Sequence, residues 1–148
     1  MSTIHPELIS VIHIKVFKAI IDTSEGYLNI PEKPEGIDVN LGQNTALNIQ
    51  KKNIRLRLNI VLQAKKSEGD NLGLRGEFGI EFHIHVDDLE RFLVDKDGEK
   101  LIDSKLGATI IGIIYSTARG IVYERTRGTL MEGFLLPVIN PNILLGNK

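Results

Sequence analysis

Two neighbouring segments, residues 54–64 and 72–86, place an apolar side chain at almost every second position. Successive side chains of a β-strand point to opposite faces, so the pattern predicts two strands with one apolar and one polar face. The residues SEGDN at 67–71 predict a hairpin turn between them. With the turn centred near Gly69, antiparallel pairing places Arg57 roughly opposite Glu81. A sheet of this kind is antiparallel and is covered by other elements on one face only.

The first third of the chain contains two further predicted strands. Apolar and polar residues alternate over about 9–21, and a weaker alternation covers 37–50. Between them, DTSEGYLNIPEKPEG holds two prolines and two glycines and predicts a long crossing loop. This loop also contains the apolar residues Tyr27, Leu28 and Ile30. They either cover the edge of the sheet or form the wall of a groove that accepts apolar segments of another chain.

Helical patterns are confined to the second half of the chain. VDDLERFLVD at 86–95 predicts a short helix, which KDGEK at 96–100 ends. A long helix is predicted to begin near Asp103 or Ser104, either of which can cap it, and to end before Gly128. The proline-containing tail has room for one final helical turn over about 141–146. Because strands come first and the helices then cover one face, the order predicts an α+β fold in a single domain, residues 1–148.

The long helix carries a stripe of small residues that is costly for a helix alone. Glycine in a helix interior costs roughly 0.5–1 kcal/mol relative to alanine. Small residues nevertheless recur every four positions, at Ala108, Gly112, Ser116 and Gly120. Such a stripe lets another backbone approach closely, and the helix is apolar over more of its girth than one sheet can cover. We therefore expect a homo-oligomer assembled through this stripe. The alternative is that the tail and the 86–95 segment cover it within one chain.

Composition removes several classes of function. The chain has no cysteine, so it has no disulfide, no thiolate nucleophile and no zinc–thiolate site. Its net charge is -1, and the basic residues of the predicted sheet are interrupted by glutamates without interleaved aromatics, so we expect no nucleic-acid binding. The longest uncharged apolar run, Leu106–Ala118, is too short to span a membrane, and the first residues lack the features of a signal peptide. We expect a cytoplasmic protein.

The sequence offers few candidates for chemistry. His83 and His85 are two apart on one predicted strand and share a face with Glu81, and His13 is within reach of that face, so a metal site is conceivable there. The alternative is that these are ordinary solvated residues of a polar strand face. No serine lies on a strained turn beside a base, and the glycines of LGLRGEFG lie inside a strand pattern. We assign no catalytic residue, no metal ligand and no cofactor.

The C-terminal third resembles the SecB protein-export chaperone family. The resemblance rests on LGA at 106–108, RGT at 127–129 and LLPVINPNILL at 135–145, and on Tyr115, Ala118, Arg119, Pro137, Val138 and Asn140. The upstream order of four strands with a long loop after the first also agrees. The resemblance implies a four-stranded antiparallel Greek-key sheet, with a long helix and a short C-terminal helix packed on one face. It also implies a homotetramer built as a dimer of dimers.

For function, the resemblance implies an ATP-independent chaperone, a holdase, that retains unfolded or precursor polypeptides in apolar grooves. By analogy of position, the groove residues are Tyr27, Leu28 and Ile30 of the crossing loop and Leu144 and Leu145 of the final helix. Family members dock on the export motor ATPase through an acidic sheet surface, where this chain has Arg75. A dedicated client such as an antitoxin is the alternative to export. A different class of function, a small-ligand or metal-binding oligomer that uses the open sheet face, also stays open.

Overall fold

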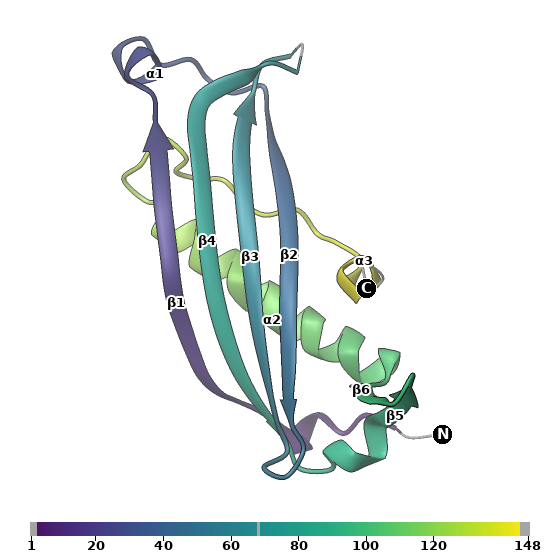
Figure 1. Ribbon diagram of the computed structural model, residues 1–148. Helices are drawn as coiled ribbons and strands as arrows, with labels where there is room; N and C mark the ends of the chain where they lie inside the picture. The colour runs from purple at the N-terminus through teal and green to yellow at the C-terminus, as the bar shows by residue number, and fades with distance from the viewer. Residues whose placement is uncertain (1–2, 68, 146–148) are drawn as a thin grey trace.

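The computed structural model describes residues 3–67 and 69–145, with the exception of the Leu145 side chain. It consists of a long, twisted four-stranded sheet, with the long helix and the C-terminal helix on one side of it, and a second, two-stranded sheet (Figure 1). The elements are the 3-10 helices η1 (Pro6–Leu8) and η2 (Leu89–Phe92), the strands β1 (Ile9–Thr23), β2 (Gly36–Asn48), β3 (Asn53–Lys65), β4 (Asn71–Val86), β5 (Leu93–Lys96) and β6 (Glu99–Ile102), and the helices α1 (Glu25–Asn29), α2 (Ser104–Arg125) and α3 (Pro141–Leu145).

The large sheet has the order β1-β4-β3-β2, and all its pairs are antiparallel. Strands β2, β3 and β4 follow one another as hairpins, and β1 reaches β2 by a crossing connection and lies beside β4. This is the predicted Greek key. The predicted register is also confirmed, since Arg57 pairs with Glu81 and its Nε lies 2.7 Å from Glu81 Oε1.

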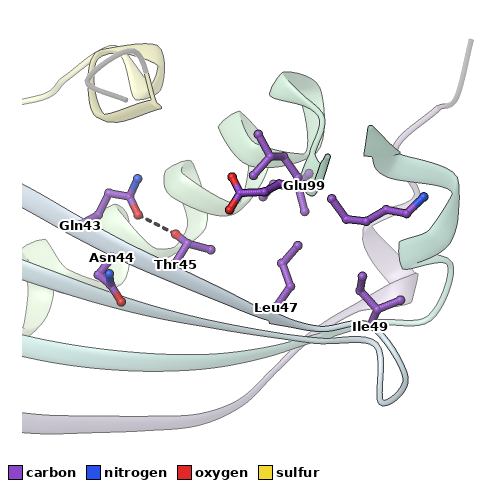
Figure 2. A pocket seen from close by; sticks show the side chains of 9 residues that line it. Gln43, Asn44, Thr45, Leu47, Ile49 and Glu99 are labelled. Carbon is purple, nitrogen blue, oxygen red and sulfur yellow. Dashed lines mark hydrogen bonds between the residues drawn. The ribbon is translucent and has the colours of Figure 1, made fainter. Parts of the chain in front are cut away.

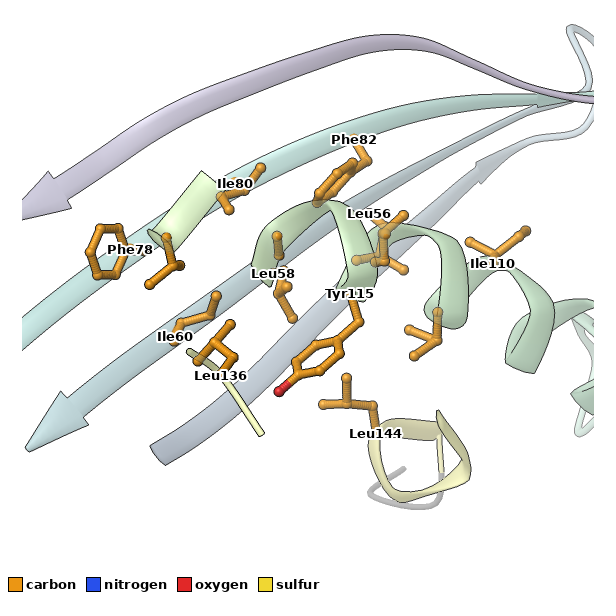
Figure 3. Close-up of a cluster of buried hydrophobic side chains, with 14 of the residues drawn as sticks. Leu56, Leu58, Ile60, Phe78, Ile80, Phe82, Ile110, Tyr115, Leu136 and Leu144 are labelled. Atoms are coloured by element: carbon orange, nitrogen blue, oxygen red, sulfur yellow. The ribbon is translucent and has the colours of Figure 1, made fainter. Parts of the chain in front are cut away.

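Strands β3 and β4 supply the sheet side of the core. Except for Val61, their apolar side chains lie on the face toward α2, called here the helix face, and the opposite face is the open face. Figure 3 shows this packing, with Leu58 of β3 and Phe82 of β4 against the inner side of α2. The alternation that predicted the two strands therefore also identifies the buried face correctly.

Helix α2 begins at the predicted cap. The Asp103 carboxylate accepts a hydrogen bond from the Leu106 backbone N–H at 2.8 Å. By length and composition alone, α2 is long and apolar enough to cross a bilayer. The uncharged run Leu106–Ala118, which is only part of this helix, did not indicate this. However, 44% of its most apolar window is buried in this fold, because the inner side of the helix covers the sheet. Packing on the sheet accounts for the apolar character of the inner side of the helix.

The short helix predicted over 86–95 is largely wrong. Only the four residues of η2 are helical, and the chain then forms the β5–β6 hairpin. Asp97 and Gly98 occupy its two-residue turn with φ of 53° and 81°. An Asp-Gly pair with both residues at positive φ is the preferred composition of such a hairpin. KDGEK is therefore a hairpin turn rather than a simple helix stop.

The crossing loop also contains a helix that the sequence did not predict. Helix α1 is capped by Ser24, whose Oγ accepts a hydrogen bond from the Tyr27 N–H at 3.2 Å. The Tyr27 side chain is buried against the start of β4, near Gly73. Figure 1 shows α1 beyond the end of β1, at the opposite end of the sheet from β5 and β6.

Two side chains of α2 hold the tail that follows the helix, because they donate hydrogen bonds to the backbone of the tail. The Tyr115 hydroxyl donates to the Pro137 carbonyl at 2.6 Å, and Arg119 Nε donates to the Leu136 carbonyl at 2.8 Å. Burial raises the pKa of Tyr115. These contacts carry the tail to the side of β2, where α3 packs against α2 (Figure 1).

Candidate functional site

Strand β2 forms one edge of the large sheet. It pairs with β3 in an unbroken register from Gly36 opposite Lys65 to Asn48 opposite Asn53, and in the described part of the chain no strand lies on its other side. The other edge strand, β1, is interrupted by register shifts after Val11 and after Val16. Irregularities of this kind protect an edge against strand addition. The β2 edge is thus the more regular template for an added strand.

A pocket of about 490 Å³ opens beside the second half of β2. Its floor comes from Gln43, Thr45 and Leu47, which lie on the helix face because they pair with buried residues of β3. Leu101 and Ile102 of β6 form the opposite wall. Figure 2 shows Leu47 and the neighbouring Ile49 facing Glu99 across this space. The pocket therefore combines apolar walls with polar groups.

A second pocket, of about 220 Å³, opens beside the first half of the same strand. It lies between Val39 and Leu41 of β2, the tail residue Ile139, and Ile143 and Leu144 of α3. Together the two pockets accompany β2 over residues 39–48, which corresponds to roughly 30 Å of extended chain, and Ile49 of the following turn also lines the larger one. We call the β2 edge and these two pockets the edge groove.

The structure separates the predicted groove residues into two places. Leu144 is buried beneath Tyr115 and lines the second pocket, as Figure 3 shows for their packing. Leu28 and Ile30 are 58% and 78% exposed, and they belong to α1 and the residue after it, at the far end of β1. Tyr27 is buried.

The Leu145 side chain lies outside the described part of the structure. The groove assignment for all five residues stays a prediction.

Sequence reasoning missed most residues of the edge groove. One signal was present in β2 itself. Its helix-face positions are apolar at Ile37, Val39 and Leu41, become polar at Gln43 and Thr45, and are apolar again at Leu47. Polar residues on the face that is otherwise buried mark the part of the strand that no helix covers. The contribution of β6 was missed, because the β5–β6 hairpin was not predicted.

The small-residue stripe of α2 faces away from the sheet. Ser116 and Gly120 are exposed, and Ala108 and Gly112 are partly so. A Cβ atom built on Gly112 or on Gly120 would have nothing within 4 Å. The chain itself therefore leaves the outer half of the stripe uncovered.

The open face carries a charged network. Glu81 is the centre of it, with His83 Nε2 at 2.7 Å from Oε2 and Arg57 Nε at 2.7 Å from Oε1. Hydrogen bonding from Arg57, followed by that from His83, lowers the pKa of Glu81 from 4.5 to about 2. Among residues 3–67 and 69–145, no three His, Cys, Asp or Glu side chains are placed to hold a metal ion. His83 is turned toward Glu81.

Comparison with known proteins identifies the fold. No protein-family model and no curated protein sequence matches the chain. Among solved structures it is similar to a SecB-like chaperone of Mycobacterium tuberculosis in complex with a peptide from an antitoxin, with 13% sequence identity and a TM-score of 0.57 over 90% of this chain and 92% of that chain. A protein of unknown function from Streptococcus agalactiae has a TM-score of 0.45 at 12% identity over 88% of this chain and 97% of that chain. The first of these likenesses concerns the fold, and the α+β arrangement described above is a SecB-like fold.

Proposed function

We propose that this chain is an ATP-independent holdase that retains extended, non-native polypeptide segments in the edge groove. The observation that carries the proposal is the free, regular edge of β2 with a pocket beside each half of the strand. The SecB-like fold supports it, since the neighbour with that fold was solved with a peptide from another protein.

The groove suits an extended client for two physical reasons. Backbone groups on the outer edge of β2 can pair with a client strand whatever its sequence, which gives affinity without specificity. Alternate side chains of that client point toward the helix face and enter the two pockets. Retention of this kind needs no catalytic residue and no nucleotide, and a client that spans both pockets gains from multivalent contact.

Assembly of several copies belongs to the same proposal. The uncovered stripe of α2, with Ile113 and Tyr123 exposed near it, is the surface we assign to a homo-oligomer, with a tetramer as the expected state. Several edge grooves on one particle would hold a long client at more than one point. The clients we expect are cytoplasmic precursors on their way to export or a dedicated partner such as an antitoxin.

Aggregation of a chemically denatured client, followed by light scattering, tests the holdase proposal. The chain at near-stoichiometric amounts should suppress aggregation without nucleotide, and unchanged aggregation would refute the proposal. Two isoleucines provide a matched pair of variants, because Ile49 lines the edge groove and is 41% exposed, whereas Ile20 lies on β1 and is 43% exposed. Ile49→Ser should weaken suppression and Ile20→Ser should not.

A separate variant tests the prediction that the crossing loop binds the client. A Leu28→Ser/Ile30→Ser variant removes two exposed apolar side chains and leaves the buried Tyr27 in place. Loss of client binding with the oligomer intact would show that α1 contributes to retention. Retention equal to that of the unaltered chain would restrict the client site to the edge groove.

A further inference from the structure

Two adjacent rows of side chains on the open face carry more positive than negative charge. Residues paired across neighbouring strands share a face, so the register of β1, β4 and β3 places them side by side. The first row is His13, His83 and Arg55, and the second row is Lys15, Glu81 and Arg57. The rings of His13 and His83 lie 5.8 Å apart, centroid to centroid. We call these six side chains the cationic patch.

The carboxylate inside the patch does not neutralise it. Glu81 is shared between Arg57 and His83. The next acid along β4, Glu77, pairs with Lys18 and Arg75, and hydrogen bonds from those two side chains lower its pKa. These partners leave no carboxylate of β4 for Lys15 or Arg55.

Lys15 and Arg55 are the uncompensated charges. Among residues 3–67 and 69–145 no ion pair is found for either of them. Arg55 donates a hydrogen bond to the neutral amide oxygen of Asn44 at 3.0 Å, and its buried Nε has no acceptor. Lys15 and Arg55 lie in different rows, on strands that β4 separates, so each row has one uncompensated cation, and each cation favours an added carboxylate.

The spacing of the patch selects an extended ligand. Side chains two residues apart on a strand are roughly 6.6 Å apart, and the two rows of the patch are separated by this distance. Alternate side chains of an extended peptide have the same spacing. A segment with acidic residues at alternate positions can therefore place one carboxylate near each row. Phe17, whose ring covers Gly79 on the same face, adds an exposed apolar surface next to the patch.

Two of the six side chains of the patch, His13 and His83, are histidines, the residue type whose charge most often responds to pH near neutrality. The titratable or charged groups that face them are Lys15 from β1, Glu81 and His85 from β4, and Arg55 and Arg57 from β3. The Nε2 of His85 lies 2.8 Å from a carboxylate oxygen of Asp87, so that histidine has an acid partner of its own beside the patch.

We propose that the cationic patch is a second binding site, separate from the edge groove, for an acidic polypeptide segment with Asp or Glu at alternate positions. The patch lies on the open face, whereas most of the residues that β2 contributes to the pockets lie on the helix face; Asn44, which accepts a hydrogen bond from Arg55, also borders the larger pocket. A partner with such a segment can therefore bind while a client occupies the groove.

Fluorescence polarisation with a labelled peptide of alternating aspartate and serine tests the site on the full chain. Binding should saturate, should weaken as salt screens the charges, and should tighten between about pH 7.5 and pH 5.5. A peptide with lysine in place of aspartate should not bind. Absence of saturable binding of the aspartate peptide would overturn the proposal, as would tighter binding of a single-stranded oligonucleotide of equal charge.

Variants locate the site. Lys15→Gln/Arg55→Gln should weaken binding by roughly tenfold, since the variant removes two cations that can each pair with a carboxylate of the peptide. The control Lys96→Gln/Arg127→Gln changes the net charge equally on β5 and just beyond α2 and should bind as the unaltered chain does. Equal weakening in both variants would mean nonspecific attraction and would overturn the proposal.

Further variants separate this site from folding and from the groove. Lys15→Gln alone changes one exposed side chain on the edge strand, so it tests the patch even if the Arg55 variant does not fold. His13→Asn/His83→Asn should abolish the pH dependence and keep most of the affinity at pH 7.5. Ile49→Ser should leave acidic-peptide binding unchanged, and a loss there would place the peptide in the edge groove instead.

Discussion

Replacing Gly112 with leucine tests the assembly surface on α2. Within one chain the substitution should be favourable, because a Cβ at this position has nothing within 4 Å and leucine is preferred over glycine in a helix by about 0.8 kcal/mol. For a chain of this size, that gain corresponds to a rise in melting temperature of roughly 2–3 °C.

The expected effect on the oligomer has the opposite sign. Where small residues let two helices approach closely, an added side chain costs about 1–3 kcal/mol through overpacking. In a symmetric interface each copy carries the substitution, so the cost enters twice and reaches about 2–6 kcal/mol. Association should weaken by at least about 30-fold. Multi-angle light scattering at micromolar concentration should show the mass shifting toward that of one chain.

Two further variants make this test decisive. Gly112 borders a small cavity of about 100 Å³ with Val138 and Ile139, into which a leucine could turn without reaching a second copy. Gly120→Leu, on the exposed part of the stripe, has no such cavity described beside it and should also dissociate the oligomer. Gly26→Leu in α1 is the matched control, since its Cβ is also free of contacts. An oligomer that persists in both stripe variants would show that the interface lies elsewhere.

Three further predictions concern stability. Because the pKa of Glu81 is about 2 in the folded chain instead of 4.5, the unfolded chain takes up the proton first as the pH falls. The free energy of unfolding should therefore decrease as the pH drops from about 4.5 to about 2. Glu81→Gln should lose less stability over that window, in acid titrations followed by circular dichroism. Tyr115→Phe removes the hydrogen bond to the Pro137 carbonyl and should lower the free energy of unfolding in urea by about 1 kcal/mol. The loss should not be larger, because Pro137 is exposed and its carbonyl can bind water instead. No change would show that this bond does not hold the tail. Gly73→Ala brings a Cβ to 2.8 Å from Ser24 Cβ and should cost about 1–3 kcal/mol, with faster amide exchange in α1 than in the sheet.

The sheet was predictable because its signal is local and repeated. In β3 and β4 the side chain at nearly every second position is buried, so a single strand shows which face is covered, and the hairpin then sets Arg57 opposite Glu81. The missed elements are short. Helix α1 has one turn, and its evidence is the Ser24 cap within a proline-rich loop. The Asp97–Gly98 turn was visible in the sequence, but the four-residue strands on either side are too short to show a period.

The edge groove depends on how far α2 and the tail extend across the sheet, and periodicity does not contain that information. Strands β1 and β2 differ in which residues stand at the helix-face positions that α2 and the tail leave uncovered. In β1 the helix-face residues Val11 and Ile14 are apolar yet each 40% exposed, although an alternation like that of β3 predicted a covered face. In β2 the helix-face positions beside the larger pocket include Gln43, which is half-buried, and Thr45, which is exposed, and their polar side chains tolerate water.

A polar floor with apolar walls at its ends favours reversible contact with a transient segment, since water can return when the client leaves. The uncovered apolar positions of β1 have no such property, and their exposure costs free energy for as long as they stay uncovered. Apolar content alone therefore could not distinguish a surface that exchanges clients from one that requires lasting cover. The distinction becomes visible only when burial is set beside polarity at the same positions of the same face.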